Sequence, residues 1–333
     1  MARNETRSWS HGRRFPEERE DFGLNQSAPQ SDGLDSSSTA LGESHLTATV
    51  VVCTRYRPAL LRSCLEGVKA LIHVPDEVIV VDNTGGDRDT ETVAREFGCI
   101  YAIEPKQGLS RARNRGLAES RSDVVAYLDD DSTPHLHWLG FMIEPFNDPE
   151  VTTVTGRIVT PESQGGDGVR LPSRSLCNKD PEWFGIATFG GLGLGSNMAF
   201  RREACAGQKL FDERLGRGAP FEVAEENYAF AFLLSKGYTA VYLPDAIVFH
   251  PSPASRGIRQ NARNAIAFSM FLFSEFPGHR LDLLRFLYRR FRHRPLAWPR
   301  DTPNPGEIIT SGWRVLIAAS FSAALLFLRV RKS

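Results

Sequence analysis

The stretch Asp123-Val-Val-Ala-Tyr-Leu-Asp-Asp-Asp131 places a short apolar run directly before three consecutive carboxylates. Valine and tyrosine favour extended strands, so we expect a buried strand that ends at the first of these three aspartates. Comparable runs begin at Leu46, Glu77 and Cys99, and each is followed by a polar segment and a helical pattern. This alternation predicts an α/β fold with a Rossmann-like, mostly parallel, doubly wound sheet that has helices on both faces.

Helical patterns follow the first three apolar runs. Pro58 suits the first turn of a helix whose apolar residues recur as far as Val68. Further helices are predicted over residues 90–97 and 109–118. Beyond the aspartates we expect a strand over residues 151–159, a long loop over 160–188, a Gly-rich stretch over 189–198, a helix over 221–235, and strands over 240–243 and 246–249.

Polar residues stand at the ends of these predicted strands. Thr54-Arg55, Asp82-Asn83 and Asp129 to Asp131 follow the first, second and fourth runs. Ligands of doubly wound sheets bind at the carboxyl ends of the strands. Three adjacent carboxylates repel one another unless some face water or a cation neutralises them. The pattern therefore predicts a site for a divalent cation, Mn²⁺ or Mg²⁺, with a solvated acidic turn as the alternative.

Seven short motifs together carry a resemblance to a known family. They occur in the order Val51-Val-Cys-Thr-Arg55, Val80-Val-Asp-Asn83, Gly108-Leu-Ser-Arg-Ala-Arg-Asn114, Tyr127-Leu-Asp-Asp-Asp131, Gly195-Ser-Asn-Met-Ala-Phe-Arg-Arg202, Glu225-Glu226 and His250. From about Thr47 to Pro251 the chain resembles the inverting family 2 glycosyltransferases of the GT-A fold. The resemblance implies metal-dependent transfer of a sugar from a nucleotide diphosphate sugar, expected to be a UDP-sugar, to an acceptor hydroxyl with inversion.

The resemblance also assigns residues to a donor site. Thr54 and Asp82 are implied to line the nucleotide pocket, Arg113 to help bind the nucleotide, and Asp129 and Asp131 to form the metal-binding DxD pair. Asp131 is the expected direct metal ligand, Asp130 is placed near the ribose, and His250 is implied as a third metal ligand. Arg55, Arg111 and Asn197 complete the expected nucleotide-sugar contacts. Several of these residues also have an interpretation without a ligand. Asp82-Asn83 is suited to a turn, Arg111 could lie on an exposed helix face, and His250 could have a purely structural role.

The general base is expected in the pair Glu225-Glu226. Family members commonly carry Glu-Asp at this position, and the aspartate deprotonates the acceptor hydroxyl. By position Glu226 takes this role, although its extra methylene leaves Glu225 open as the base. Two glutamates at a helix N-terminus are also favoured by the helix dipole alone.

The region after residue 255 is basic. From Arg256 to Ser333 there are fourteen Lys/Arg against four Asp/Glu, although the net charge of the whole chain is zero. Leu281, Leu284, Tyr288 and Phe291 recur at helical spacing with arginines on another face, which predicts an amphipathic helix suited to an anionic membrane surface or to packing on the domain. The apolar stretch within residues 308–328 is short for a membrane span, so we expect an interfacial anchor.

These patterns suggest a three-part organisation. We expect a disordered leader over residues 1–45, a catalytic domain over 46–255 with a nucleotide-binding half (46–131) and an acceptor half (132–255), and a membrane-associating region over 256–333. Five scattered cysteines without metal-type spacing indicate buried or idle thiols in a reducing compartment, which favours a cytoplasmic location at the inner face of the cell membrane.

Two other classes of protein share part of this pattern. A sugar-1-phosphate nucleotidyltransferase has similar architecture but usually carries a Gly-rich loop after its first strand, and residues 54–58 lack glycine. A non-catalytic membrane protein that binds nucleotide sugars is the other alternative. The expected acceptor is a glycan, a lipid-linked sugar or a small molecule, in cell-surface glycan or glycolipid synthesis, and no motif for reading nucleic acid accompanies the arginines.

Overall fold

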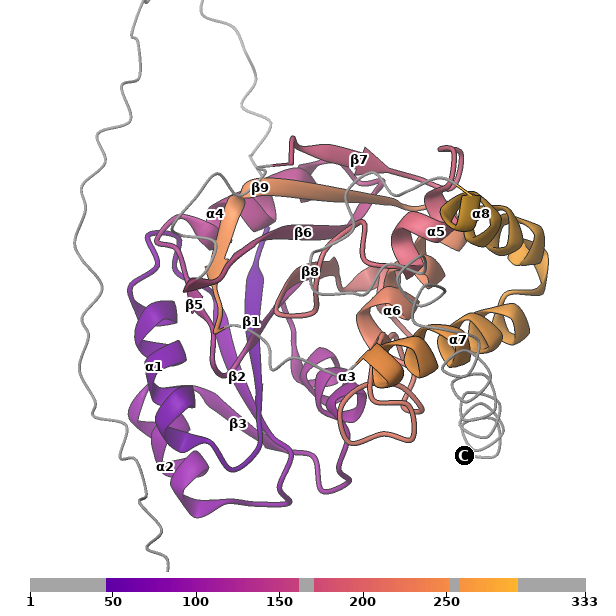
Figure 1. Ribbon diagram of the computed structural model, residues 1–333. Helices are drawn as coiled ribbons and strands as arrows, with labels where there is room; N and C mark the ends of the chain where they lie inside the picture. Colours follow the sequence, from indigo (N-terminus) through magenta and orange to yellow (C-terminus); the bar gives the residue numbers. More distant parts are fainter. Residues whose placement is uncertain (1–45, 162–170, 252–257, 293–333) are drawn as a thin grey trace, which may run out of the picture. The chain divides into compact units, whose positions relative to one another are not determined.

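The computed structural model describes residues 46–161, 171–251 and 258–292 (Figure 1). The predicted leader over residues 1–45 and the apolar stretch over 308–328 lie outside the described residues. Among the helices that the structure describes, none is long and apolar enough to cross a membrane.

The first part of the chain forms the parallel half of one sheet, as the sequence predicts. Its strands lie in the order β3-β2-β1-β4, and all three pairings are parallel. The bounds agree with the predicted ones to within a few residues. The elements are β1 (Ala48–Thr54), α1 (Pro58–Lys69), β2 (Glu77–Asp82), α2 (Arg88–Glu96), β3 (Ile100–Ile103), α3 (Leu109–Glu119) and β4 (Val124–Asp129).

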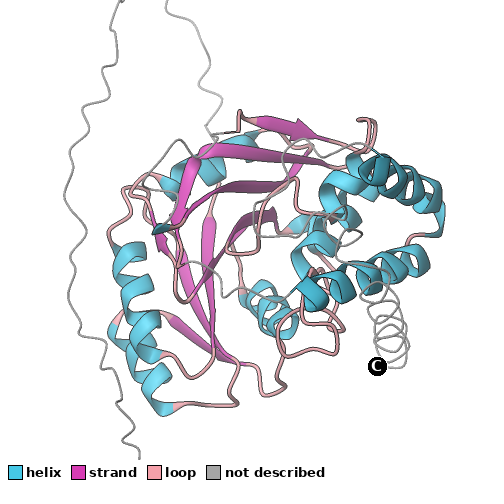
Figure 2. Cartoon of the chain, viewed as in Figure 1, coloured by secondary structure: helices cyan, strands magenta, loops and turns pink. Residues whose placement is uncertain are grey.

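Alternate residues of the central strands enter two separate cores. Val51 of β1 belongs to the core that includes α3, whereas its neighbours Val50 and Val52 belong to the core that includes α1 and α2. Figure 2 shows helices on both sides of the sheet. Gly116 lets α3 approach β1 closely, because a Cβ there would lie 2.4 Å from Val51 Cγ1. The predicted doubly wound arrangement is therefore confirmed.

The second half of the sheet is mixed. Continuing from β4, the strand order is β8-β6-β9-β5; β8 is antiparallel to both its neighbours, β6 and β9 are parallel, and β5 is antiparallel to β9. β7 also pairs with β9. The bounds are β5 (Thr133–Pro134), β6 (Val151–Val159), β7 (Arg174–Leu176), β8 (Asn197–Arg201) and β9 (Thr239–Phe249).

Several predictions for this half were wrong in detail. The last residues of the Gly-rich stretch begin strand β8, and the expected loop over 160–188 contains β7 and α5. The two short strands expected around residue 245 are one strand, β9, which stays paired with β6 because a register shift beside Gly156 accommodates the extra residues. The helix expected from Phe221 begins at Glu225, because Phe221 bridges to Leu215.

The remaining helices cover the second half of the sheet. α5, α6, α7 and α8 contribute to the same core as α3, and α4 contributes to the core of α1 and α2. The bounds are α4 (Trp138–Ile143), α5 (Trp183–Thr188), α6 (Glu225–Ser235), α7 (Ile258–Glu275) and α8 (Arg280–Arg292), with short 3₁₀ helices at Glu144–Asn147, Glu203–Cys205 and Pro277–His279.

All five cysteines are free. Burial raises the pKa of the Cys53 and Cys205 thiols to about 12, so both are protonated at neutral pH. Thiols in this form are poor nucleophiles and poor metal ligands. Cys64 and Cys205 are buried as expected, whereas Cys53, Cys99 and Cys177 are partly exposed.

Candidate functional site

Strands from both halves of the sheet end at one edge. Thr54 at the end of β1 pairs with Asp82 of β2, and Cys53 pairs with Asp129 of β4. β9 reaches the same edge, where the backbone N–H of His250 donates to the carbonyl oxygen of Val159, 3.0 Å away. Residues far apart in the sequence thus meet where ligands bind in sheets of this type.

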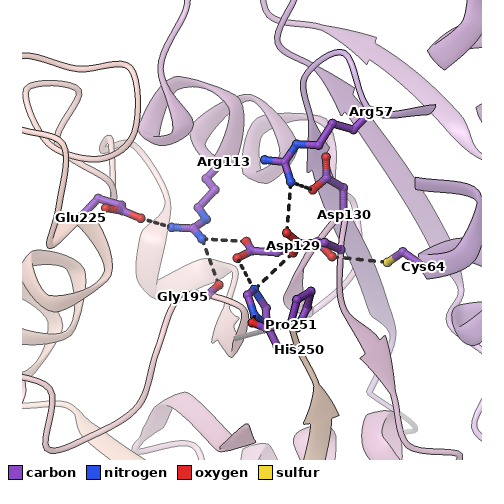
Figure 3. Close-up of polar contacts among 10 residues, drawn as sticks. Arg57, Cys64, Arg113, Asp129, Asp130, Gly195, Glu225, His250 and Pro251 are labelled. Carbon is purple, nitrogen blue, oxygen red and sulfur yellow. Dashed lines mark hydrogen bonds and ion pairs between the residues drawn. The ribbon is translucent and has the colours of Figure 1, made fainter. Parts of the chain in front are cut away.

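His250 faces two of the three consecutive aspartates (Figure 3). Its Nε2 lies 3.2 Å from Asp131 Oδ1 and 3.6 Å from Asp129 Oδ2. One ligand atom from each of the three residues lies within 4.8 Å of the others, a grouping that could hold a metal ion. Two carboxylate oxygens and one imidazole nitrogen suit Mn²⁺ and similar divalent cations. The structure therefore brings together the three residues that the sequence suggested as metal ligands.

The imidazole of His250 forms hydrogen bonds with the carboxylates of Asp129 and Asp131 and partly balances their negative charge. Burial disfavours the charged form of His250, but hydrogen bonds to Asp129 and Asp131 outweigh it and raise its pKa to about 10. In return, the hydrogen bond from His250 lowers the pKa of Asp131. Burial opposes ionisation of Asp129, yet His250 and Arg113 hold its pKa below the usual value. A cation that binds here must displace the imidazolium proton.

Asp130 points away from this trio. Its Oδ2 accepts a 2.7 Å hydrogen bond from Thr54 Oγ1, and its Oδ1 lies 3.0 Å from Arg57 Nη1. The side chain is buried, and burial together with the neighbouring carboxylates raises the pKa of Asp130 to about 6. Two residues expected to contact the nucleotide, Thr54 and Asp130, are therefore bonded to each other.

Asp82 is fully buried at the end of β2. Its Oδ1 accepts from the backbone N–H of Thr84, and its Oδ2 accepts from the backbone N–H of Asp87 and from Tyr101 Oη. Burial opposes ionisation, but these hydrogen bonds outweigh it and lower the pKa of Asp82. The carboxylate holds the loop between β2 and α2 in its present shape.

Arg113 connects the aspartates to the helix α6 (Figure 3). Its Nη1 lies 2.6 Å from Glu225 Oε1, and its Nη2 donates to the carbonyl oxygen of Gly195 at 3.0 Å and lies 3.4 Å from Asp129 Oδ1. Burial disfavours the charged guanidinium, but Glu225 and Asp129 outweigh it and raise the pKa of Arg113. Both terminal nitrogens are thus engaged within the protein.

The two adjacent glutamates have different surroundings. Glu225 is buried and paired with Arg113. Glu226 is half-buried and forms no ion pair among the described residues. Burial and the neighbouring Glu225 carboxylate raise the pKa of Glu226 to about 8. Of the pair, Glu226 has the carboxylate that is not already bound to an arginine.

Three other predicted contacts are engaged elsewhere. Asn197 is fully buried; its Oδ1 accepts from Trp138 Nε1, and its Nδ2 donates to the carbonyl oxygens of Arg157 and Ala246. Arg111 pairs with Glu213. Arg55 Nε donates to the carbonyl oxygen of Asn83, and its guanidinium lies over the ring of Tyr56. The structure does not bring Asn197 or Arg111 into the aspartate cluster.

The sequence did not single out Arg57 or Tyr101. Arg57 Nη1 lies 3.1 Å from Asp131 Oδ2 as well as 3.0 Å from Asp130, so it bridges two of the three aspartates. Its position directly after a strand end and before Pro58 was the available signal. No local pattern marks Tyr101, because its contact with Asp82 arises only when β2 and β3 pair.

Solved structures share this architecture. A mannosyltransferase from Pyrobaculum calidifontis superposes with a TM-score of 0.52 at 17% identity, covering 86% of this chain and 88% of that one. TarS from S. aureus gives a TM-score of 0.53 at 15% identity, covering 86% of this chain and 55% of that one. These similarities concern the fold, which is of the GT-A glycosyltransferase type.

Sequence comparisons identify the family. The Glycosyl transferase family 2 model matches residues 49–207. The succinoglycan biosynthesis protein ExoM of Rhizobium meliloti is 30% identical over 222 residues, which cover 62% of this chain and 67% of that protein. An N-acetylglucosaminyltransferase of the same organism is 26% identical over 208 residues, and the chain spans only 47% of its length. The chain belongs to glycosyl transferase family 2.

Proposed function

We propose that this protein transfers a sugar from a nucleotide diphosphate sugar to an acceptor hydroxyl with inversion of configuration, using a divalent cation. The observation that carries the proposal is the convergence of Asp129, Asp131 and His250 at one sheet edge, which Arg113 joins to Glu225 at the start of the helix that also carries Glu226. The solved mannosyltransferase contains GDP-Man and Mn²⁺, which supports this class of donor and cation. The family match favours transfer over the nucleotidyltransferase alternative.

The three candidate metal ligands are suited to a divalent cation. Asp129, Asp131 and His250 would hold Mn²⁺ or Mg²⁺, which when bound would stabilise the negative charge of the leaving diphosphate. Arg113 holds the Asp129 carboxylate and at the same time neutralises Glu225. Arg57 restrains Asp131 from the other side. We assign both arginines a positioning role, because both terminal nitrogens of Arg113 and Nη1 of Arg57 are already bonded to protein groups.

Glu226 is the proposed general base. Its carboxylate takes the proton of the acceptor hydroxyl while that oxygen attacks the anomeric carbon from the face opposite the diphosphate. One displacement from the opposite face inverts the configuration. Glu225 is unsuited to this role, because proton uptake there would break its buried ion pair with Arg113.

The cation site is tested by Asp131→Ala in the full chain. We expect wild-type protein to be stabilised against heat by UDP only when Mn²⁺ is present, and we expect Asp131→Ala to lose this stabilisation together with transfer and donor hydrolysis. Asp89→Ala, which removes an exposed carboxylate from α2, is the matched control and should behave as wild type. Near-normal turnover by Asp131→Ala with metal present would refute the metal assignment.

The donor nucleotide is part of the same experiment. A thermal-shift panel of UDP- and GDP-sugars with Mn²⁺ ranks the donors directly, and we expect a UDP-sugar to give the largest shift. Metal-dependent UDP binding without sugar release to any acceptor would instead favour a non-catalytic nucleotide-sugar-binding protein.

We also propose that α8 rests on an anionic membrane surface. Leu281, Leu284 and Tyr288 are exposed on one side of this helix, and Arg285 is exposed beside them. Leu283 on the opposite side packs into the core. Exposed apolar residues next to arginine match the chemistry of a lipid interface. Such a position would place the enzyme at the cytoplasmic face of the membrane, where lipid-linked acceptors of cell-surface glycans are found.

A further inference from the structure

Arg157 is a charged side chain that the proposed reaction does not use. It lies near the end of β6 and is half-buried. Its Nε is buried and has no hydrogen-bond partner. The other buried side-chain atoms without a partner in the described part of the chain belong to uncharged residues, namely Ser132, Thr152, Thr153 and Asn227.

The buried Nε–H of Arg157, which has no acceptor, is unfavourable by itself. Removing a charged donor from water without supplying an acceptor costs free energy, and buried polar groups in folded proteins almost always have partners. Among the described residues, no carboxylate forms an ion pair with Arg157, whereas Asp129 and Asp131 contact His250 and Glu225 contacts Arg113. Arg157 is therefore available for an anion that comes from outside the chain.

The backbone around Arg157 is fixed on both sides. Its carbonyl oxygen accepts a 2.9 Å hydrogen bond from Asn197 Nδ2, and two residues later Val159 accepts from the His250 backbone. Two residues earlier, Thr155 Oγ1 donates to the carbonyl oxygen of Leu192 in the Gly-rich stretch. The guanidinium thus starts from a rigid strand that runs to the same edge as His250.

The position of β6 in the sheet favours a contact of Arg157 with the acceptor substrate rather than with the nucleotide-sugar donor. β8 lies between β4, which carries Asp129, and β6, which carries Arg157. Neighbouring strands are about 4.8 Å apart, so the two strands are separated by about 10 Å. β6 also contacts α6, the helix that begins at Glu225 and carries Glu226. The strand that carries Arg157 therefore lies next to the helix that carries the proposed general base, which is the side from which we expect the attacking hydroxyl to enter.

We propose that Arg157 binds an anionic group, a phosphate or a carboxylate, of the acceptor substrate. The planar fork of arginine matches the paired oxygens of both groups. The proposal rests on the proposed function, and it narrows the acceptor from any hydroxyl compound to a sugar or glycan that carries a negative charge near the attacked hydroxyl.

The test measures acceptor binding with the donor site filled. Full-length protein is saturated with Mn²⁺ and UDP, and the dissociation constants of glucose 1-phosphate, glucuronate and methyl α-glucoside are determined by isothermal titration calorimetry. We expect at least one charged probe to bind about tenfold or more tightly than the neutral glucoside. The stronger of the two charged probes distinguishes a phosphate from a carboxylate.

Arg157→Gln should remove the preference for the charged probe and leave the affinity for Mn²⁺ and UDP within about twofold of wild type. Arg157→Lys should restore part of the preference, which separates a charge effect from a packing effect. Arg115→Gln removes an arginine from the exposed face of α3, where it pairs with Glu119, and serves as the matched control. This control should keep the full preference.

Three results would overturn the proposal. These are equal or undetectable binding of all three probes to wild type, an unchanged preference in Arg157→Gln, or a loss of Mn²⁺ and UDP affinity in that variant as large as the loss for the charged probe. The last result would assign Arg157 to the donor. Failure of wild-type protein to bind Mn²⁺ and UDP would contradict the proposed function itself and is therefore distinguishable.

Discussion

Two neighbouring glutamates show how much the surroundings of a residue decide its chemistry. Glu225 is buried against Arg113, whose guanidinium stabilises the carboxylate, whereas the Glu226 carboxylate experiences burial and the negative charge of its neighbour. A base is most effective when its pKa lies near the working pH. The raised pKa of Glu226, about 8, meets this condition.

We expect Glu226→Gln to lower kcat by roughly 10²- to 10⁴-fold, because the amide cannot accept the proton of the acceptor hydroxyl. In wild type, kcat/KM should increase with pH through the pKa of Glu226, which burial raises to about 8, because the carboxylate is a base only when it is deprotonated. Steady-state kinetics across this range provide the check. Glu225→Gln should instead destabilise the fold; an active Glu226→Gln beside a folded, inactive Glu225→Gln would reverse the assignment.

The residues of the candidate site were predictable to different degrees. Asp129, Asp131 and His250 each follow a strong strand pattern, so their meeting at one sheet edge follows from topology. The contact of Arg113 with Glu225 joins positions 112 residues apart and no local pattern specifies it. Asn197 was expected at the ligand, but its amide instead joins α4, β6 and β9, which can be seen only after these elements have packed.

At the scale of elements, the Gly-rich stretch before β8 packs against α3 through one glycine. A Cβ on Gly195 would lie 2.7 Å from Arg113 Nη2, and the guanidinium cannot simply swing aside because Glu225 holds its other nitrogen. Small additions at such a contact move the side chain that they meet. The affected side chain is the one that holds Asp129 in place.

We therefore expect Gly195→Ala to lower the free energy of unfolding by about 1 kcal/mol and to weaken Mn²⁺-dependent UDP binding about tenfold. Urea unfolding and calorimetry measure the two effects. Gly278→Ala is the control, because a Cβ there meets nothing within 4 Å. Unchanged UDP affinity in Gly195→Ala would show that Arg113 does not position Asp129, the proposed metal ligand.

The strands and helices of the parallel half could be predicted from the sequence because its β-branched runs are separated by residues that end a strand, such as Asp82 and Asp129. In the second half of the sheet, the local sequence predicts the strands less clearly. β8 follows a run of glycines and is a strand because β4 and β6 pair with it on both sides. β9 contains Pro244 and Asp245, which normally indicate a turn, yet the strand continues past them because β6 provides a long parallel partner.

At the scale of the whole molecule, α8 presents an apolar stripe on the surface. Leu281 is 65% exposed and Leu284 is 50% exposed. Burying a leucine side chain contributes about 1.5–3 kcal/mol, so each one that enters a lipid interface should strengthen membrane binding by tenfold or more. Arginine next to this stripe should make the binding depend on anionic lipid.

We expect wild-type protein to float with vesicles that contain phosphatidylglycerol more than with pure phosphatidylcholine vesicles. The double variant Leu281→Gln, Leu284→Gln should lose most of this binding. Leu60→Gln on α1, where the leucine is 42% exposed, is the matched control and should float as wild type. Equal flotation of the double variant and wild type would exclude α8 as the membrane-binding element.

The order of the sheet also has a consequence for synthesis. The three candidate metal ligands lie at or just after the ends of β4 and β9, and β9 inserts between β6 and β5 rather than adding at the outer edge. During translation, Asp129 and Asp131 emerge from the ribosome long before His250. A nascent chain that ends before β9 therefore has an incomplete set of candidate ligands, so we expect the emerging protein to bind the proposed cation only when the last strand of the sheet is in place.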